Sequence, residues 1–373
     1  MTRKMLPAMI GAILVSGVSI AHADVQVFGH IDTSIDATDQ DGGTDDQTLN
    51  CTTCSIGFKG SEDLGNGLKA IFKLDFQYDI TQRNTGKAKA KKKGGFVTTP
   101  TGAGGVATTT GTVVTSVKDT SSITDRDQWL GLAGNFGQVR VGTISTVYKS
   151  HGAMIDPIYR TALQLRDRGL QSNMHTGAGS NGQGRAENTI RYDSPSWNGL
   201  KVGATFTLSP DNKNDGDNGY GGGISYENAG VLVFADYITN NTGRDDDAYK
   251  IGGKYTLNNN IAFMGQYEFD GGLITSKAAG TTGDGADTWF LGGSFTLGNN
   301  MLFASYGRAD GGDRLSDYNA FNLVGTHSMS KRTKIYAGYS NIDCDDQDTN
   351  VCSKVGPKAG EDEQISFGMK HIF

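Results

Sequence analysis

The sequence predicts an all-β chain that folds as a sixteen-stranded antiparallel transmembrane β-barrel with long external loops. Runs of about ten residues alternate apolar and polar side chains, which is the pattern of strands with one lipid-facing and one wet face. Short and long connections alternate between these runs. The chain of 373 residues contains 54 glycines, roughly twice the usual share. Mean hydropathy of -0.39 excludes a bundle of transmembrane helices.

Residues 1–23 have the features of a secretory signal peptide. Arg3 and Lys4 precede an apolar run over 5–20, and Ala21-His22-Ala23 provides a small-x-small cleavage signal. The apolar run is too short to span a membrane comfortably. We therefore expect a leader at 1–23 and a single barrel domain at 24–373. The net charge of -6 argues against a nucleic-acid partner.

The connections between the strands give the strand number. Fifteen connections join sixteen up-and-down strands and leave both termini on the short-turn side, as in outer-membrane barrels. Closure of the sheet is compulsory in lipid, because no water can satisfy the amides of an open edge. The short turns lie at about 62–67, 134–137, 195–199, 228–230, 258–260, 298–300 and 328–331. The long loops lie at about 38–53, 81–123, 149–186, 210–219, 240–247, 271–285, 309–316 and 343–360.

Strand faces follow from the alternation of side chains. Over 68–78, Phe72 and Leu74 share an apolar face, while Lys73 and Asp75 share the opposite one. The run 231–239 has a weak polar face, since Leu232 and Phe234 share it with Asp236. A soluble sandwich would explain any single strand, but not sixteen in succession without a helix. Aromatic residues near strand ends fit the girdles at the two membrane interfaces: Phe28, Tyr78, Trp129, Tyr192, Tyr226, Tyr237, Tyr267, Phe295, Tyr306 and Phe373.

Several segments resemble those of Gram-negative general-diffusion porins. The opening strand 25–32, the run Ser55-Ile56-Gly57-Phe58-Lys59-Gly60-Ser61-Glu62-Asp63-Leu64-Gly65-Asn66-Gly67, and the segments 130–142 and 190–195 follow in the family's order. The terminal Phe373 resembles the family's signal for the barrel assembly machinery. The resemblance covers 24–373, with the external loops as the divergent part.

The resemblance implies an outer-membrane channel for passive diffusion of small hydrophilic solutes and ions. It further implies a homotrimer in contact with outer-membrane lipid and lipopolysaccharide. The third external loop, here about 148–185, would fold into the lumen and narrow it. An acidic element of that loop, Asp156 with Asp167, would face a basic wall. Asp156-Pro157 is equally well explained as a turn initiator.

The basic wall is predicted from alternation. Lys59 alternates with Ile56 and Phe58, Arg126 shares a face with Gln128 opposite Trp129, Arg140 lies between Val139 and Val141, and Arg191 lies between Ile190 and Tyr192. Cations that faced lipid at mid-depth would cost roughly 2–4 kcal/mol each, so a lumenal position is expected. They either set a transverse field across the pore or are ordinary solvated side chains. Related porins often have an arginine where this chain has Ser55, which predicts a weaker cationic side.

The four cysteines form two close pairs in sequence, Cys51 with Cys54 and Cys344 with Cys352. An exported chain meets an oxidising periplasm, so we expect disulfides within each loop. Pairing between the loops stays open, because barrel closure makes them neighbours. A metal or redox site at Cys51–Cys54 is not expected, because no second CxxC or nearby histidine completes a ligand set.

The remaining polar clusters favour surface roles. The basic run Lys87–Lys93 is expected to be a solvated loop or to contact lipopolysaccharide or a neighbouring subunit. The acidic clusters 245–247 and 345–346 lack the spacing of a calcium loop. We find no catalytic motif and expect no enzyme activity, cofactor or metal. Alternatives are a substrate-specific channel, a surface adhesin or receptor, and a barrel lipase.

Overall fold

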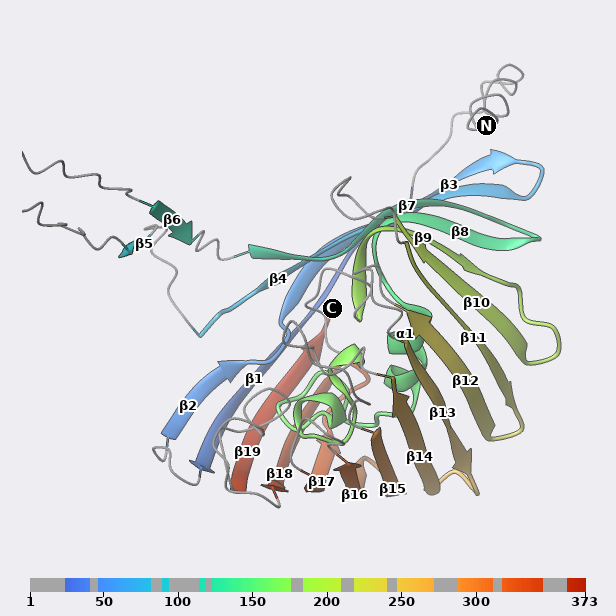
Figure 1. Cartoon of the computed structure of the whole chain (residues 1–373). Helices are drawn as coiled ribbons and strands as arrows, with labels where there is room; N and C mark the ends of the chain where they lie inside the picture. Colours follow the sequence, from blue (N-terminus) through green and yellow to red (C-terminus); the bar gives the residue numbers. More distant parts are fainter. Residues whose placement is uncertain are drawn as a thin grey trace, which may run out of the picture.

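The computed structural model describes residues 24–40, 46–81, 89–93, 114–118, 123–175, 184–208, 218–239, 247–271, 287–310, 317–344 and 361–373. One antiparallel sheet curls until its first and last strands meet (Figure 1). β1 (Asp24–Gln40) pairs with β19 (Glu361–Ile372) from His30–Ile372 to Gln40–Asp362. Beyond this ladder, Gly29 and Phe373 exchange two backbone hydrogen bonds of 3.1 Å. The predicted closure is confirmed.

The other strands pair with their neighbours in chain order around the barrel. They are β2 (Asp46–Cys51), β3 (Ser55–Gly65), β4 (Leu68–Tyr78), β7 (Ile123–Gly134), β8 (Gly137–Ser145), β9 (Arg185–Asp193), β10 (Leu200–Thr207), β11 (Gly219–Asn228), β12 (Val231–Thr239), β13 (Asp247–Thr256), β14 (Ile261–Asp270), β15 (Asp287–Leu297), β16 (Asn300–Asp310), β17 (Tyr318–Ser328) and β18 (Thr333–Cys344).

The second position of the barrel is filled by two strands. β2 pairs with the part of β1 from Thr33 to Thr38, and β3 pairs with the part from Asp24 to His30. The 17 strands of the sheet therefore occupy sixteen positions, as predicted. The predicted extent of the first loop, 38–53, is wrong, because most of these residues extend the β1–β2 hairpin. Within the predicted loop 81–123, β5 (Lys89–Lys93) and β6 (Val114–Lys118) form a separate two-stranded sheet.

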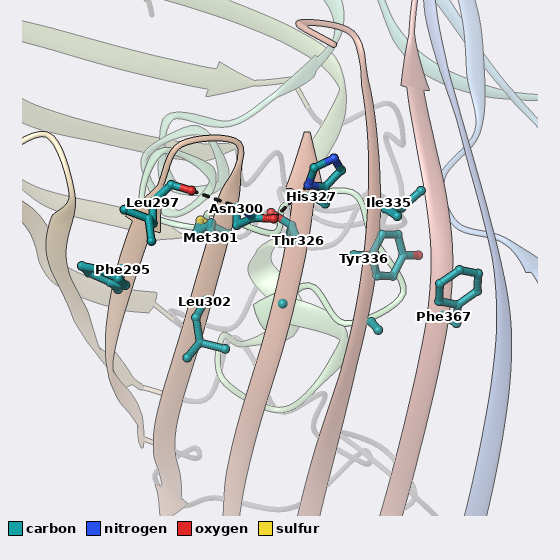
Figure 2. A pocket seen from close by; sticks show the side chains of 12 residues that line it. Phe295, Leu297, Asn300, Met301, Leu302, Thr326, His327, Ile335, Tyr336 and Phe367 are labelled. Atoms are coloured by element: carbon teal, nitrogen blue, oxygen red, sulfur yellow. Dashed lines mark hydrogen bonds between the residues drawn. The ribbon is translucent and has the colours of Figure 1, made fainter. Parts of the chain in front are cut away.

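The predicted outward faces are confirmed by exposure. Leu74, Val233 and Leu291 lie on the outer face of the barrel and are 41%, 48% and 65% exposed. Their sequence neighbours Asp75, Leu232 and Phe290 are buried. A shallow hollow of about 460 Å³ lies on the outer face across β15–β19. There the small residues Gly325 and Ala337 pair with each other, in register with Leu302 on one side and Phe367 on the other. Figure 2 shows Leu302 and Phe367 on either side of the hollow.

The third loop folds inside the ring of strands, as predicted (Figure 1). We call residues 146–184 loop 3. It begins with α1 (Val147–Met154) and continues through the short turns η1 (Leu165–Asp167) and η2 (Asn173–His175). The helix was not expected from sequence. It begins where the Thr146 hydroxyl accepts a hydrogen bond from the Lys149 N–H at 3.2 Å. No helix in the described residues is long and apolar enough to cross a membrane.

An apolar cluster fixes loop 3 to one side of the lumen. Ile155, Ile158, Leu163, Leu165 and Leu170 of the loop share this cluster with inward residues of β12 to β18. We call these inward residues the apolar wall: Leu232, Phe234, Met264, Phe290, Phe303, Ala309, Tyr318, Ala320, Val324, Tyr336 and Ile342. Loop 3 therefore packs against the face of 231–239 that was predicted to be only weakly polar.

Two glycines let the loop come close to the apolar wall. A Cβ at Gly338 would lie 2.7 Å from Leu163 Cδ1, and a Cβ at Gly307 would lie 2.9 Å from Leu170 Cδ2. Both distances are shorter than a van der Waals contact, so a larger residue at either position would push the leucine side chain away from the wall.

Buried charges provide a second attachment of loop 3. The Glu268 carboxylate accepts hydrogen bonds from the Ser172 hydroxyl at 2.5 Å and the Tyr148 hydroxyl at 2.9 Å. Lys250 Nζ lies 3.3 Å from Asp236 Oδ2 and donates to the Tyr148 carbonyl. Removing one member would leave a buried charge without its partner, which is strongly destabilising.

Leu163→Ala should lower the free energy of unfolding by about 2–5 kcal/mol, because it leaves a cavity where the loop meets the wall. The check is denaturant unfolding in lipid vesicles. Leu323→Ala is the control, since this leucine is 42% exposed on the outer face and lipid can fill its space. Equal losses in the two variants would contradict the packing described here.

Candidate functional site

The wall opposite the seat of loop 3 is built from charged residues of β4, β7, β8 and β9, which we call the charged wall. Arg126 is buried there, and its guanidinium lies 3.4 Å from Asp75 Oδ2 and donates to Gln77 Oε1 at 2.8 Å. Arg126 faces inward, as predicted, but regular alternation along β7 is not the reason. Between the pairs Leu74–Gln128 and Phe76–Asp125, β7 has two residues where β4 has one.

This bulge places both Arg126 and Asp127 on the inner side. Asp127 there receives four contacts: Arg185 Nε lies 2.9 Å away, Lys73 Nζ lies 3.3 Å away, and Ser145 donates from its hydroxyl at 2.8 Å and its N–H at 3.0 Å. The predicted outward position of Trp129 is wrong, because its ring lies under the lumenal Arg140 guanidinium, 5.1 Å from Cζ to centroid. Phe28 is likewise lumenal, with Lys73 Nζ 5.3 Å from its ring centre. Such rings attract cations through their quadrupole.

Arg140 and Arg191 lie directly opposite each other on β8 and β9. Like charges in this position repel, and the Asp193 carboxylate contacts both: Arg191 NH2 lies 2.7 Å from it, and Arg140 NH2 also pairs with it. Lys59 is exposed, with Nζ 5.5 Å from the Phe28 ring centre. The four predicted cations thus line the same side of the lumen, most of them paired with carboxylates that the sequence reasoning did not single out.

The two predicted acidic residues of loop 3 lie in different surroundings. Asp156 is buried, and its carboxylate accepts hydrogen bonds from the N–H groups of Ile158 at 3.0 Å and Leu165 at 3.2 Å. This is the turn-forming geometry that was the alternative reading of Asp156-Pro157. The Asp167 side chain is 40% exposed, 3.7 Å from Arg166 Nε. It accepts from Gln164 Nε2 at 2.5 Å.

Loop 3 brings further cations toward the charged wall. Arg160 and Arg166 flank the ring of Tyr159, with Cζ 5.6 Å and 5.0 Å from its centre. Arg160 NH1 lies 3.1 Å from His30 Nδ1, and Lys370 Nζ donates to the Tyr159 carbonyl at 2.6 Å. The contacts described for the Arg160 side chain include no carboxylate.

The electrostatic potential around Tyr159 is positive. Burial by itself would raise the pKa of Tyr159, but the guanidinium groups of Arg166, Arg160 and Arg126 hold that pKa below its usual range. The pKa of the Lys149 ammonium is lowered well below its usual value, first by burial and then by Arg185 and Arg166. Neither Arg160 nor Arg166 was predicted, because an irregular loop offers no alternation from which to read a face.

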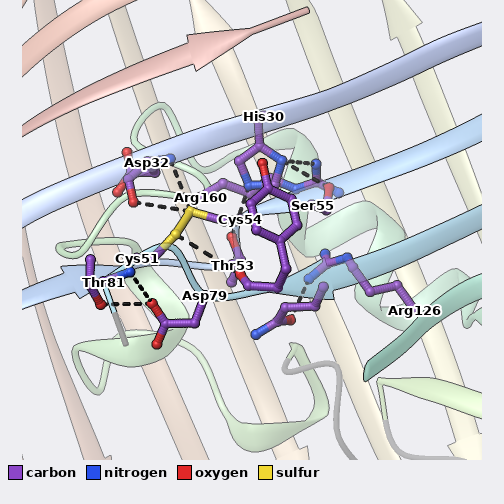
Figure 3. The surroundings of a disulfide bond; sticks show 12 residues. His30, Asp32, Cys51, Thr53, Cys54, Ser55, Asp79, Thr81, Arg126 and Arg160 are labelled. Atoms are coloured by element: carbon purple, nitrogen blue, oxygen red, sulfur yellow. Dashed lines mark hydrogen bonds between the residues drawn. A yellow bond between two sulfur atoms is a disulfide. The ribbon is translucent and has the colours of Figure 1, made fainter. Parts of the chain in front are cut away.

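The three described cysteines are disulfide-bonded, and the predicted pairing of Cys51 with Cys54 is confirmed. Cys51 and Cys54 form a disulfide, which Figure 3 shows beside His30 and Arg160. Cys344 is also disulfide-bonded, whereas Cys352 lies outside the described residues, as do the leader 1–23, Lys87 and the acidic cluster 345–346. In the described part of the chain, no three His, Cys, Asp or Glu side chains converge as metal ligands.

A closed antiparallel barrel with an apolar exterior, a charged interior and an inward-folded loop defines the class of outer-membrane β-barrels with a constricted lumen. The chain belongs to the Gram-negative porin family, whose model matches residues 8–347. The family places the chain in the Gram-negative outer membrane.

Relatives by sequence include the major outer membrane protein P.IB of Neisseria gonorrhoeae, 26% identical over 253 residues. That match covers 62% of this chain and 58% of the relative. The P.IB protein of Neisseria meningitidis serogroup B strain MC58 is 26% identical over 57% of this chain and 53% of its own. The chain thus spans little more than half the length of these relatives.

Solved structures with the same fold include an anion-selective porin from Comamonas acidovorans, with a TM-score of 0.69 and 21% identity over 94% of this chain and 100% of that one. Salmonella typhi OmpF has a TM-score of 0.66 and 17% identity over 94% and 97%. A trimer form of OmpT from Vibrio cholerae has a TM-score of 0.61 and 14% identity over 94% and 99%.

Asp156 makes stability depend on pH. Burial raises the pKa of its carboxyl to about 7, above the value of about 3.9 in an unfolded chain. The native state therefore binds this proton more tightly, and stability is lost as pH rises from about 4 to 7. The asparagine of Asp156→Asn does not titrate, and it can accept only one of the two backbone hydrogen bonds. Loss of the other lowers the stability by about 1–3 kcal/mol. The wild type's advantage over this variant should be largest near pH 4 and shrink by pH 8.

The temperature at which the folded band disappears on SDS gels measures this advantage. Asp167→Asn is the control for loss of a loop 3 carboxylate, because the Asp167 side chain is 40% exposed. A constant difference between wild type and Asp156→Asn from pH 4 to 8 would contradict the assignment.

Proposed function

We propose that the protein forms a water-filled channel through which small hydrophilic solutes and ions diffuse passively, with a preference for anions. Membership of the Gram-negative porin family supports the channel. The inward fold of loop 3 supports a size limit, since the loop occupies part of the lumen beside the charged wall. Passage of this kind needs no cofactor and no covalent step, so we propose a channel and not an enzyme.

The observation that carries the anion preference is Arg160. Arg126, Arg140, Arg185 and Arg191 of the charged wall each pair with a carboxylate. Arg160 instead contacts a histidine nitrogen and a tyrosine ring. Its charge is therefore less compensated than theirs, in a low-dielectric setting where fixed charges act over longer distances than in bulk water. This differs from a basic wall facing an acidic loop, because the loop itself contributes cations.

The roles predicted for Lys59, Arg126, Arg140 and Arg191, and for Asp167, remain part of this proposal. These cations and the loop arginines outnumber the carboxylates Asp75, Asp127 and Asp193, which supports an excess of positive charge. The buried Asp156 is proposed as a structural residue of the loop. We also propose a homotrimer, in keeping with the trimer form recorded for OmpT of Vibrio cholerae. The leader at 1–23 and the assembly role of Phe373 stay predictions.

Purified protein in planar bilayers should insert in conductance steps that close in threes. In a salt gradient the reversal potential should report a higher permeability for chloride than for potassium. Single-step closures of one unit would contradict the trimer, and absence of any conductance would contradict the channel.

Arg160→Gln should lower the chloride-to-potassium permeability ratio by a factor of about 2–5, equivalent to about 0.4–1 kcal/mol, as expected for one partly screened charge. Arg332→Gln is the matched control, because Arg332 is exposed on the short turn between β17 and β18. Asp167→Asn should move the ratio the other way. An unchanged ratio in Arg160→Gln would overturn the assignment of anion preference to this residue.

A further inference from the structure

The second barrel strand is interrupted next to Arg160. Cys51 pairs with Thr33 and Ser55 pairs with His30. Between these two pairs β1 has two residues, whereas the neighbouring strand has three, Thr52-Thr53-Cys54. The extra residue is a bulge, and the disulfide between Cys51 and Cys54 encloses it, with 5.8 Å between the two Cα atoms.

The backbone within the bulge is unusual. Thr53 has a φ of 52°, in the left-handed region that a β-branched residue rarely occupies. Three contacts fix the ends of the bulge: the Thr52 N–H donates to the Asp32 carbonyl at 3.0 Å, the Asp32 N–H points at Cys54 Sγ at 3.4 Å, and the Tyr78 N–H donates to the Cys54 carbonyl at 3.1 Å. Such a conformation persists only where the surroundings over-determine it.

Thr53 within the bulge and Ser55 directly after it hold the His30 ring. Thr53 Oγ1 lies 3.2 Å from His30 Nε2, and Ser55 Oγ lies 3.1 Å from His30 Nδ1. His30 is 1% exposed and Ser55 is fully buried. The ring cannot turn without losing at least one of these hydrogen bonds.

The same ring is the partner of Arg160. A guanidinium group only donates hydrogen bonds, so His30 Nδ1, 3.1 Å from Arg160 NH1, must accept, and the Ser55 hydroxyl donates to the same lone pair. Nε2 then carries the proton and donates to Thr53 Oγ1, which fixes the neutral tautomer. Figure 3 shows the sequence of contacts from the disulfide through Thr53 and His30 to Arg160. Arg160 itself has a φ of 62°, so its backbone also occupies the left-handed region.

We propose that the Cys51–Cys54 disulfide is a specificity-determining element of the pore: it locks the bulge that orients His30, and His30 holds the Arg160 guanidinium toward the lumen. Opening the disulfide lets Thr53 return to an extended conformation and removes the acceptor of His30 Nε2–H. The ring then rotates, and Arg160 leaves its position. This inference rests on the proposed anion preference and names the residues that maintain it. Thr53, His30 and the two cysteines act as positioning residues.

The test is a double-mutant cycle on the chloride-to-potassium permeability ratio. Cys51→Ser/Cys54→Ser should produce at least half of the logarithmic change that Arg160→Gln produces. Adding Arg160→Gln to the cysteine variant should then change the ratio little further. The matched control is Cys344→Ser/Cys352→Ser, which removes the remaining pair of cysteines and should leave the ratio unchanged.

His30 variants separate orientation from general damage to the barrel. His30→Leu cannot accept a hydrogen bond and should reproduce the cysteine variant. His30→Gln retains an acceptor and a donor and should restore most of the wild-type ratio. Folding is checked for each variant by the heat-dependent shift on SDS gels. If the cysteine variant does not fold, the reductant TCEP is added to wild-type channels already inserted in the bilayer, and the same loss of selectivity is expected.

Two results would overturn this inference: a wild-type ratio in the folded cysteine variant, or a change that adds in full to that of Arg160→Gln. Failure of the proposed function is recognised separately, because wild type and Arg160→Gln would then already give the same reversal potential.

Discussion

The apolar contact between loop 3 and one side of the barrel interior decides which surface of the lumen is left for water. Leu163, Leu165 and Leu170 are completely buried against the wall formed by β12 to β18. Burial of apolar side chains is the main contribution that stabilises the folded loop. The loop therefore packs at this one position in the lumen. The charged strands β4, β7, β8 and β9 are not covered by this cluster. Arg160 of the loop contacts His30 of β1, and the Tyr159 carbonyl accepts from Lys370 of β19.

The charged wall combines attraction and repulsion at short range. Arg140 and Arg191 are opposed across two strands, and Asp193 lies between their guanidinium groups. Arg126 and Asp127 face inward together only because a bulge in β7 interrupts the alternation. A second interruption, at the disulfide between β2 and β3, positions His30. Irregularities of the strands, more than the regular ladder, set the positions of Arg126, Asp127 and His30.

The sequence was sufficient to predict the barrel and part of the set of residues that line its lumen. Period-two alternation depends only on lipid outside and water inside, so closure, the sixteen positions and the outward faces that include Leu74, Val233 and Leu291 were predicted correctly. The same rule placed Arg140 and Arg191 inside. It assigned Trp129 to the wrong face, because a bulge adds one residue and reverses every face beyond it. It also assigned Phe28 to an interface, although its ring lies beside Lys59 and Lys73 in the lumen.

Loop 3 was the part that sequence could not resolve. The family resemblance implied an inward fold, but the irregular backbone of the loop has no period from which to assign directions. Asp156 could be a pore carboxylate or a turn former, and only its two backbone hydrogen bonds separate these readings. One available signal was not used: Leu232 and Phe234 on a supposedly wet face indicated an apolar surface that something must cover. That surface is where the loop packs.

The division of loop 3 into a wall-packed side and a lumenal side is tested most directly by thiol modification during current recording. Arg160→Cys and Leu163→Cys channels, three residues apart in the loop, are exposed to a negatively charged methanethiosulfonate, with wild-type channels as background. We expect a rapid change of current in Arg160→Cys and none in Leu163→Cys. Equal modification of both positions, or modification of Leu163→Cys alone, would contradict the account.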